Sequence, residues 1–433
     1  MRRLVWKGEI TANSVASALP RARQSDPKIE QKVRDLLADV QLNGSDALSK
    51  QALEFDGVLP QSIRVPQSAL DQALAEFDPL LESAIQESIR RVRLVSQEQL
   101  PGNITSNVTI GGSVELRFKP VDSVGVYVPG GKAVYPSSTI MNVIPAQVAG
   151  VKRIALASPA QKANGGLPDK TVLATAALLG ITEVYAIGGA GAVAAFAYGV
   201  EDLSLEPVQM ITGPGNIYVA TAKQLLRSVV AIDSEAGPTE IMVIGDETAN
   251  PAWIAADLIS QAEHDENAAS ILLATTSELI DQVEQELQKQ VKVAANQARV
   301  LAALEGPQSA LVLVDSLDVA AAVANEYAAE HLSLQTLNAR KLSTLISNAG
   351  AIFIGSYAPV SLGDYLAGSN HVLPTGAQAK RSAGLGVFSF LRPQQVVEFD
   401  APALAEVTEK LEIFSNSEGL PGHGEAARIR FKP

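Results

Sequence analysis

Cysteine is absent from the 433 residues of this sequence. A disulfide framework, a cysteine-based zinc site and a thiol nucleophile are therefore excluded. Basic side chains are outnumbered as well, since 34 lysines and arginines and 47 acidic residues give a net charge of −13. No stretch combines clustered basic residues with aromatic ones, so we expect no nucleic-acid partner for a chain that repels phosphate.

Long apolar runs are also missing. Residues 184–200 form the longest uncharged apolar stretch, which glycines interrupt and Glu183 and Glu201 flank. Because a transmembrane helix needs about 20 apolar residues in succession, a buried strand and helix explain this stretch better. The first residues carry charges at Lys7 and Glu9 and lack the apolar core of a secretion signal. We expect a cytoplasmic protein without a membrane partner.

The patterning of the chain predicts an α/β protein with more than one domain, because 433 residues exceed what one core usually supports. Residues 28–100 have apolar residues at helical spacing, and residues 107–128 have the pattern of strands. Short apolar strands then alternate with helical stretches, at residues 124–128, 154–157, 184–187, 208–211, 241–244, 271–274, 311–314 and 352–354. This alternation predicts mainly parallel sheets in two Rossmann-like halves that meet near residues 233–239.

Residues 364–390 interrupt the alternation with a long stretch that contains glycine, serine and proline. Such a length without regular structure indicates a functional loop or disorder. A short helix is expected after it, at about residues 401–414.

Three glycine-rich turns follow expected strands. They are PGGK at 129–132, GGAGA at 188–192 and GPGN at 213–216. Glycine lets the backbone approach a ligand closely, and in open α/β sheets ligands lie beyond the carboxyl ends of the strands. Each turn alone has even odds of being only a tight turn, but together they predict a nucleotide or cofactor crevice.

One of these turns imitates the dinucleotide fingerprint. The pattern Gly-x-Gly-x-x-Ala begins at Gly189, and Glu206 lies near the spacing of a ribose-binding acid. A lone fingerprint has low specificity, and the other two turns offer Tyr127 and Asn216, which are equally able to hold a dinucleotide.

The four histidines can be considered one at a time. Asn250 and Pro251 are expected to begin a helix, on which an apolar stripe directs Gln261 toward the core. His264, three residues later, lies on a neighbouring part of that face. A buried amide without a partner costs about 1–3 kcal/mol, so a ligand or metal is a reasonable partner. Spacing alone favours the alternative, in which His264 caps the helix end and Gln261 bonds to a loop.

A second candidate pair is Glu330 and His331, expected at the end of a helix whose apolar stripe includes Val323 and Tyr327. Two adjacent bases there could serve an alcohol proton and a water molecule. The alternative is a histidine that is satisfied within the core, which is the more frequent case.

Asp364 and His371 lie in the long stretch, and His423 lies between glycines near the carboxyl end. Together with Gln261 and His264, Asp364 and His423 would form an oxygen and nitrogen donor set suited to zinc. The spacing is dispersed and no compact metal motif is present, so the residues alone leave this site open.

Seven segments, taken together and in order, resemble the histidinol dehydrogenase family over nearly the whole chain. They are VGVYVPGGKAVYPSSTIMNVIPAQVAGV, GPGNIYVATAK, DSEAGPTEIMVI, DLISQAEHD, NEYAAEHLSLQT, GDYLAGSNHVLPTG and SEGLPGHGEAARIR. The resemblance implies an NAD-dependent dehydrogenase that oxidises L-histidinol to L-histidine through L-histidinal with two NAD, at the end of histidine biosynthesis. It also implies a homodimer with a shared active site.

The resemblance assigns roles residue by residue. It implies catalytic roles for Glu330 and His331. The implied zinc ligands are Gln261, His264, Asp364 and His423, the last supplied by the partner subunit. The implied NAD-contacting positions are Tyr127, Gly191 and Asn216. The implied substrate-binding positions are Thr239, Gln261, His264, His331, Asp364, Glu418 and His423. On these roles we expect His331 to accept the alcohol proton and Glu330 to activate water for the second oxidation, since no thiolate is available.

The expected organisation has four parts: an amino-terminal arm at 1–25, a substrate and metal domain at 26–123 together with 239–378, an NAD-binding domain at 124–238 and a dimerisation tail at 379–433. Two positions depart from the family pattern, because Gly191 is more usually Gln and Thr239 more usually Ser. These departures leave two alternatives open: a dehydrogenase of another polar alcohol with the same fold, and a non-catalytic relative that binds metal and nucleotide. The choice between zinc and manganese is open too.

Overall fold

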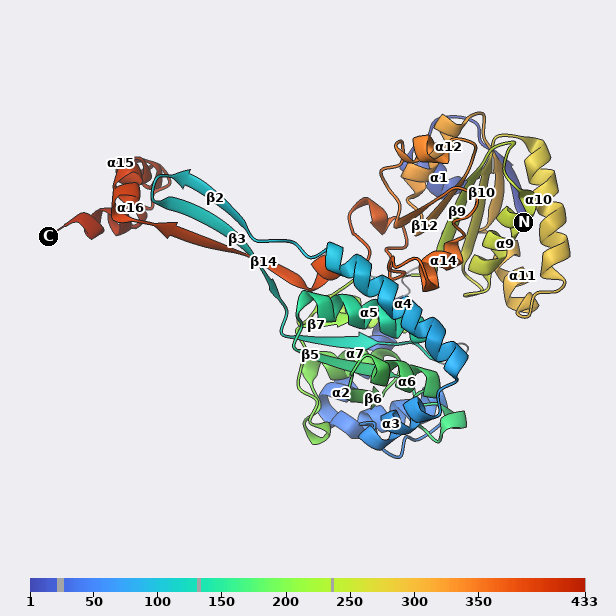
Figure 1. Cartoon of the computed structure of the whole chain (residues 1–433), viewed down its shortest axis with the longest axis horizontal. Helices are drawn as coiled ribbons and strands as arrows, with labels where there is room; N and C mark the ends of the chain where they lie inside the picture. The colour runs from blue at the N-terminus through green and yellow to red at the C-terminus, as the bar shows by residue number, and fades with distance from the viewer. Residues whose placement is uncertain (22–26, 131–133, 235–236, 433) are drawn as a thin grey trace.

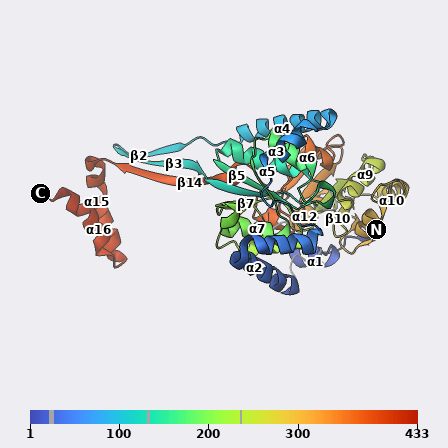
Figure 2. The same cartoon turned by 90° about the horizontal axis from the view of Figure 1, so that it is seen from below.

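A computed structural model describes residues 1–21, 27–130, 134–234 and 237–432. Two lobes, each built around a parallel sheet, lie side by side, and a long arm extends away from them (Figures 1 and 2). The amino terminus lies in one lobe and the carboxyl terminus lies at the far end of the arm.

The first lobe contains a six-stranded parallel sheet. Its strands, in spatial order, are β1 (Arg2–Val5), β11 (Ala310–Leu313), β10 (Ala269–Ala274), β9 (Glu240–Gly245), β12 (His331–Gln335) and β13 (Ala351–Ile354). The helices of this lobe are α1 (Ala12–Ala18), α9 (Pro251–Ala262), α10 (Ser277–Val291), α11 (Gln297–Glu305), α12 (Leu317–Tyr327), α13 (Ala339–Ser343) and α14 (Val360–Tyr365).

Both faces of this sheet are covered. Ile241 and Val243 of β9 pack with α9, α10 and α11 on one face, whereas Met242 and Ile244 pack with α1 and α12 on the other. Alternate side chains of a strand point to opposite faces, so a strand that is buried on both sides needs the unbroken apolar run that β9 has.

The second lobe contains a five-stranded parallel sheet. Its strands, in spatial order, are β6 (Glu183–Ala186), β5 (Arg153–Ser158), β4 (Ser123–Tyr127), β7 (Met210–Thr212) and β8 (Ala231–Ile232). One face is covered by α3 (Gln67–Ala75), α4 (Pro79–Glu98), α5 (Pro136–Ala149) and α6 (Lys170–Leu178). The other face is covered by α2 (Pro27–Gln51), α7 (Gly189–Tyr198) and α8 (Ile217–Leu225).

The arm is a three-stranded antiparallel sheet with two helices at its end (Figure 1). Its strands are β14 (Leu391–Phe399), β3 (Gly112–Pro120) and β2 (Ile104–Thr109), and its helices are α15 (Ala401–Ser417) and α16 (Pro421–Arg428). The remaining single turns are η1 (Ala52–Asp56), η2 (Lys162–Asn164), η3 (Glu201–Leu203), η4 (Gln378–Lys380), η5 (Val387–Phe390) and η6 (Ile429–Phe431).

The expected alternation of strands and helices is present, and the chain passes from one parallel sheet to the other between β8 and β9. Two expectations need correction. Residues 27–98 pack on the five-stranded sheet, as α2 against α7 and α8, α3 against α6 and α4 against α5, and not in one domain with residues 239–378. The expected arm at residues 1–25 contains β1, which is an edge strand of the six-stranded sheet.

A third correction concerns the helix expected to reach His331. That helix, α12, ends at Tyr327, because Ala328 adopts a left-handed conformation with φ of 53°. His331 instead begins β12, whose five residues are all buried. The segment HLSLQ was not recognised as a buried strand because it contains polar residues, whereas strands that are buried on both faces usually consist of apolar residues.

Candidate active site

Six polar side chains from three parts of the first lobe gather at the amino-terminal ends of β9 and β12. Gln261 lies in the last turn of α9 and His264 in the turn after it, because α9 runs back along the sheet from the end of β9. His331 begins β12, and Glu330 immediately precedes it. The other two are Asp364, in α14, and His371, which follows it.

Glu330 is held by two donors. The hydroxyl of Thr239 and the backbone N–H of Glu240, the latter at 2.9 Å, both donate to Oε2 of Glu330. The side chain is buried, and this burial raises the pKa of Glu330 to about 8, against the opposing effect of the two hydrogen bonds. A carboxylate whose pKa lies near the working pH suits general acid and base chemistry.

His331 presents one free ring nitrogen. Its Nδ1 lies 3.2 Å from the backbone carbonyl of Glu240, which can only accept, so Nδ1 carries the proton. Nε2 is buried and has no hydrogen-bond partner among the described residues. Burial also lowers the pKa of His331, which favours the neutral ring. The ring therefore offers an unused lone pair at Nε2.

The three expected metal ligands of the lobe lie around this pair. Nε2 of Gln261 donates to the hydroxyl of Thr239, which leaves the amide oxygen Oε1 without a partner among the residues described. The carboxylate of Asp364 interacts electrostatically with the rings of three histidines, His264, His331 and His371. Neither that carboxylate nor the ring of His264 has a hydrogen bond within the described part of the chain.

His371 joins the two lobes at this place. Its Nδ1 lies 3.1 Å from the backbone carbonyl of Asp364, and its Nε2 lies 3.3 Å from the hydroxyl of Ser138 in α5. The cluster therefore faces the second lobe.

Glu418 and His423 are placed elsewhere by the structure. Glu418 is the C-cap of α15 and His423 lies in the first turn of α16, so both are at the far end of the arm, where both are exposed (Figure 1). One copy of the chain thus brings together Gln261, His264 and Asp364 but not His423. Among the described residues, no three side chains of the His, Cys, Asp and Glu types are close enough to hold a metal ion.

The expected cofactor residues lie at the carboxyl ends of strands in the second lobe. Tyr127 ends β4, and its hydroxyl accepts a hydrogen bond from the backbone N–H of Gly189 at 3.2 Å. Asn216 is the N-cap of α8, where its side-chain oxygen accepts from the N–H groups of Tyr218 and Val219. Residues 131–132 of the PGGK turn lie outside the described residues. The two remaining turns, at Gly188 and Gly213, open onto the same edge of the sheet.

The turn at Gly213 is fixed by a buried ion pair. Lys223 bonds to Asp233, and both side chains are 2% exposed. Lys223 also donates to the carbonyl of Gly213 at 3.1 Å, and Asp233 accepts from its N–H at 2.8 Å. Gly213 has φ of +120°, and a Cβ there would lie 2.0 Å from the carbonyl oxygen of Tyr127. Only glycine fits this approach.

Gly191 lies inside α7, buried against α2. A Cβ at Gly191 would lie 2.6 Å from Oε1 of Gln51, the last residue of α2, so the amide of Gln51 occupies the space beside this glycine. The fingerprint interpretation of this turn fails at Glu206. The backbone carbonyl of Glu206 accepts from Arg153, which begins β5, so Glu206 lies at the amino ends of the strands, opposite the glycine turns.

Sequence reasoning missed the pair that supports Glu330 and His331. Arg21 forms an ion pair with the buried side chain of Glu240, and its guanidinium lies 3.7 Å from the ring centroid of Tyr327. The partners are 219 positions apart in the chain, so no spacing rule could have found them.

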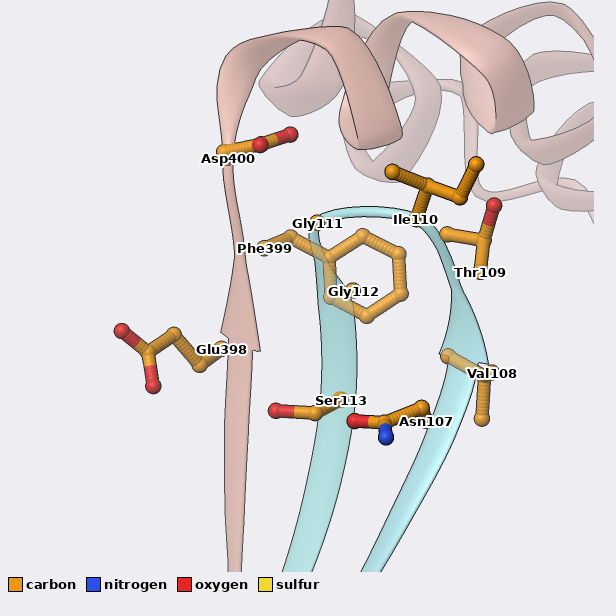
Figure 3. Close-up of a pocket in the computed structure, with 10 residues that line it drawn as sticks. All are labelled: Asn107, Val108, Thr109, Ile110, Gly111, Gly112, Ser113, Glu398, Phe399 and Asp400. Atoms are coloured by element: carbon orange, nitrogen blue, oxygen red, sulfur yellow. The ribbon is translucent and has the colours of Figure 1, made fainter.

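A separate hollow of about 840 Å³ lies on the arm, at the β2–β3 turn and the end of β14 (Figure 3). It is lined by Asn107, Val108, Thr109, Ile110, Gly111, Gly112, Ser113, Glu398, Phe399 and Asp400. It contains none of the side chains described above.

A family model described as histidinol dehydrogenase matches residues 19–431 of the chain. The chain belongs to the histidinol dehydrogenase family. A histidinol dehydrogenase of Thermobifida fusca (strain YX) is 52% identical over 432 residues, which cover 99% of this chain and 98% of the relative. That of Leifsonia xyli subsp. xyli (strain CTCB07) is 54% identical over 398 residues, which cover 92% and 91% respectively.

The same likeness is seen in three dimensions. The crystal structure of histidinol dehydrogenase from Elizabethkingia anophelis matches with a TM-score of 0.94 at 31% identity, covering 99% of this chain and 98% of that chain. The expected family and the expected α/β fold are thus confirmed for this member of the histidinol dehydrogenases. None of its helices, within the part of the chain described, combines the length and apolar character needed to cross a membrane.

Proposed function

We propose that this chain oxidises L-histidinol to L-histidine in two successive hydride transfers to NAD. Each active site would hold a divalent cation, which the types of ligand indicate to be zinc. One observation carries the proposal: the buried Nε2 of His331, beside Glu330, has no hydrogen-bond partner among the residues that the structure describes. A base placed there can accept the proton of an alcohol, as the first oxidation requires.

The donor groups fit the proposed metal. Gln261 offers an amide oxygen, His264 an imidazole and Asp364 a carboxylate, and none of these groups has another partner among the described residues. Oxygen and nitrogen ligands of this kind suit zinc. When bound, the cation would hold the imidazole and amine of histidinol as a template, and NAD would accept the hydride.

The protein's own residues then divide the proton transfers. Nε2 of His331 accepts the hydroxyl proton in the first oxidation, while the carbonyl of Glu240 keeps Nδ1 protonated. In the second oxidation Glu330 activates water, because the sequence has no cysteine to act as nucleophile. Thr239 holds Glu330 in place by donating to Oε2.

The proposed enzyme is a homodimer whose arms are exchanged. His423 and Glu418 lie far from the cluster of their own chain, so a second copy must bring them if they serve it. The end of the arm also exposes large apolar side chains, with Ile413 64% and Phe414 69% exposed. Exposed apolar surface of this kind marks a contact with another protein surface. We propose that His423 of the partner subunit is the fourth metal ligand and that the partner's Glu418 binds the substrate amine.

Turnover tests the chemistry directly. Purified protein supplied with zinc, excess NAD and a limiting amount of L-histidinol is expected to form two NADH and one L-histidine per substrate. Absence of turnover would overturn the proposal, and activity on another polar alcohol in its place would identify a different substrate. A ratio of one NADH per histidinol would refute the second step.

Mixing two inactive variants tests the shared site. In a hybrid of His331→Ala and His423→Ala chains, one of the two sites keeps an intact His331 and receives an intact His423. Unfolding and refolding equal amounts together should restore about a quarter of wild-type activity, from half the dimers with one good site each. No recovery would show that each site lies within one chain. Refolded single variants and refolded wild type serve as controls.

A further inference from the structure

Asp56 is a carboxylate that no pattern of residues singles out. It ends the single turn η1 that follows α2, and Gly57 after it has φ of 68°. A Cβ built on Gly188 would lie 3.1 Å from Oδ2 and 3.3 Å from Oδ1 of Asp56. The carboxylate therefore packs against the glycine turn that follows β6.

The same carboxylate lies beside Tyr127. Asp56 acts electrostatically on the phenol of Tyr127, whose hydroxyl accepts from the N–H of Gly189. Asp56, Tyr127 and the Gly188–Gly189 turn thus form one group at the carboxyl ends of β4 and β6, the edge at which open α/β sheets bind nucleotides.

Asp56 has no partner in the described part of the chain that explains its position. Within the described residues it forms no hydrogen bond and no ion pair, and burial alone raises its pKa to about 6. A partly desolvated carboxylate without a cation or donor is unfavourable, so such groups are uncommon away from functional sites.

We propose that Asp56 accepts hydrogen bonds from the adenosine ribose hydroxyls of NAD and thereby selects NAD over NADP. This inference rests on the cofactor site of the proposed function. Two carboxylate oxygens match the adjacent 2′- and 3′-hydroxyls of a ribose, whereas a 2′-phosphate would bring a second negative charge to the same place.

The adenosine end of NAD fits this position better than the nicotinamide end. Asp56 has no electrostatic interaction with the catalytic cluster, whereas Tyr135, on the path from β4 into α5, interacts with Asp265 and Arg299 of the first lobe. The nicotinamide must reach His331, so the ribose beside Asp56 is the more distant one. Glu206, the other acid considered for this role, lies at the opposite edge of the sheet.

The test compares the binding of NADH and NADPH, followed by fluorescence, in the full-length protein without substrate. Asp56→Ala is expected to weaken NADH binding about tenfold or more, as loss of a hydrogen-bonded charged group does. Asp56→Asn removes the charge and should narrow the preference for NADH over NADPH by about tenfold. Glu54→Gln, which neutralises an exposed carboxylate in the same turn, is the matched control and should change neither affinity.

A purely structural role for Asp56 predicts a different pattern. Because its carboxylate lacks a partner among the described residues, Asp56→Asn should raise the melting temperature at pH 8 while it impairs NADH selection. Loss of a structural contact would instead lower the melting temperature. An unchanged ratio of NADH to NADPH affinity in Asp56→Asn would overturn the inference. Wild-type protein that binds NADH with selectivity but does not oxidise histidinol would refute the proposed function alone. Normal turnover of histidinol together with an unchanged ratio of NADH to NADPH affinity in Asp56→Asn would refute this inference alone.

Discussion

The substitution Glu330→Gln is expected to separate the two oxidations. Gln keeps the shape of Glu330, and its side-chain oxygen can still accept from Thr239 and from the N–H of Glu240. It removes the negative charge of the carboxylate and with it the ability to take a proton. If Glu330 activates water and His331 deprotonates the alcohol, the variant should retain much of its alcohol oxidation and lose aldehyde oxidation.

Two magnitudes follow from the structure. A positioned general base contributes roughly 10²- to 10⁴-fold to a rate, so the aldehyde step should fall by about that factor. Burial raises the pKa of Glu330 to about 8, which means that the folded state holds this proton more tightly than the unfolded state does. The stability of the metal-free wild type should therefore fall as pH rises from about 4.5 to 8 and stay low above it.

The same reasoning predicts that Glu330→Gln stabilises the metal-free protein at pH 8.5 by up to about 3–5 kcal/mol, from the roughly three pKa units involved. At pH 4.5 the difference should nearly vanish, because Glu330 is then protonated in the folded state and about half protonated in the unfolded state. Glu247→Gln, at an exposed position, should leave stability and both rates unchanged.

The assay uses L-histidinol and L-histidinal as separate substrates and follows NADH by absorbance, with urea unfolding in chelator at both pH values. Equal loss of both steps would refute the assignment of water activation to Glu330. A variant that is less stable than wild type at pH 8.5 would refute the view that the ionised carboxylate is held at a free-energy cost.

Three further predictions concern the second lobe. Lys223→Met leaves Asp233 buried without its cation and should lower the free energy of unfolding in urea by about 3–5 kcal/mol. The double variant with Asp233→Leu should recover only part of this loss, because the N–H and carbonyl of Gly213 then lose their side-chain partners. Gly213→Ala places a Cβ 2.0 Å from the carbonyl of Tyr127 and should destabilise by at least about 2 kcal/mol; a melting temperature like that of wild type would contradict the approach described. Gly191→Gln should lower the melting temperature because Gln51 fills the adjacent space, and adding Gln51→Ala should reverse much of the loss. Additive effects of the two substitutions, measured by calorimetry, would contradict this contact.

Much of the fold could be predicted from local patterns. The apolar runs of β9 and β10 and the N-cap at Asn250 carry their own signals, and the structure places these elements where the patterns put them. The strand β12 could not be predicted in the same way, because His331, Ser333 and Gln335 are polar residues that only the neighbouring strands bury. The helix before it ends at Tyr327, because Ala328 after it is left-handed, and alanine has no preference for that conformation.

In the candidate site too, features that depend on one element could be predicted, and those that depend on distant contacts could not. The apolar stripe of α9 correctly directed Gln261 inward, since that inference needed only one helix. Asp56 meets Gly188 across 132 positions, and Gln51 meets Gly191 across 140, so no pattern of spacing links either pair. The role proposed for His423 depends on how two chains assemble. A single chain shows only that His423 lies far from the cluster of that chain.

The supports of the catalytic pair explain why residues far from any substrate matter to the site. The backbone of Glu240 binds Glu330 through its N–H and His331 through its carbonyl. The side chain of Glu240 is fixed in turn by Arg21, which follows α1, and by the N–H of Gly376 at 3.3 Å. A buried carboxylate that lost either partner would carry an uncompensated desolvation cost at the residue whose backbone holds both bases. The amino-terminal segment therefore sets the positions of Glu330 and His331 although it contributes no side chain to the chemistry.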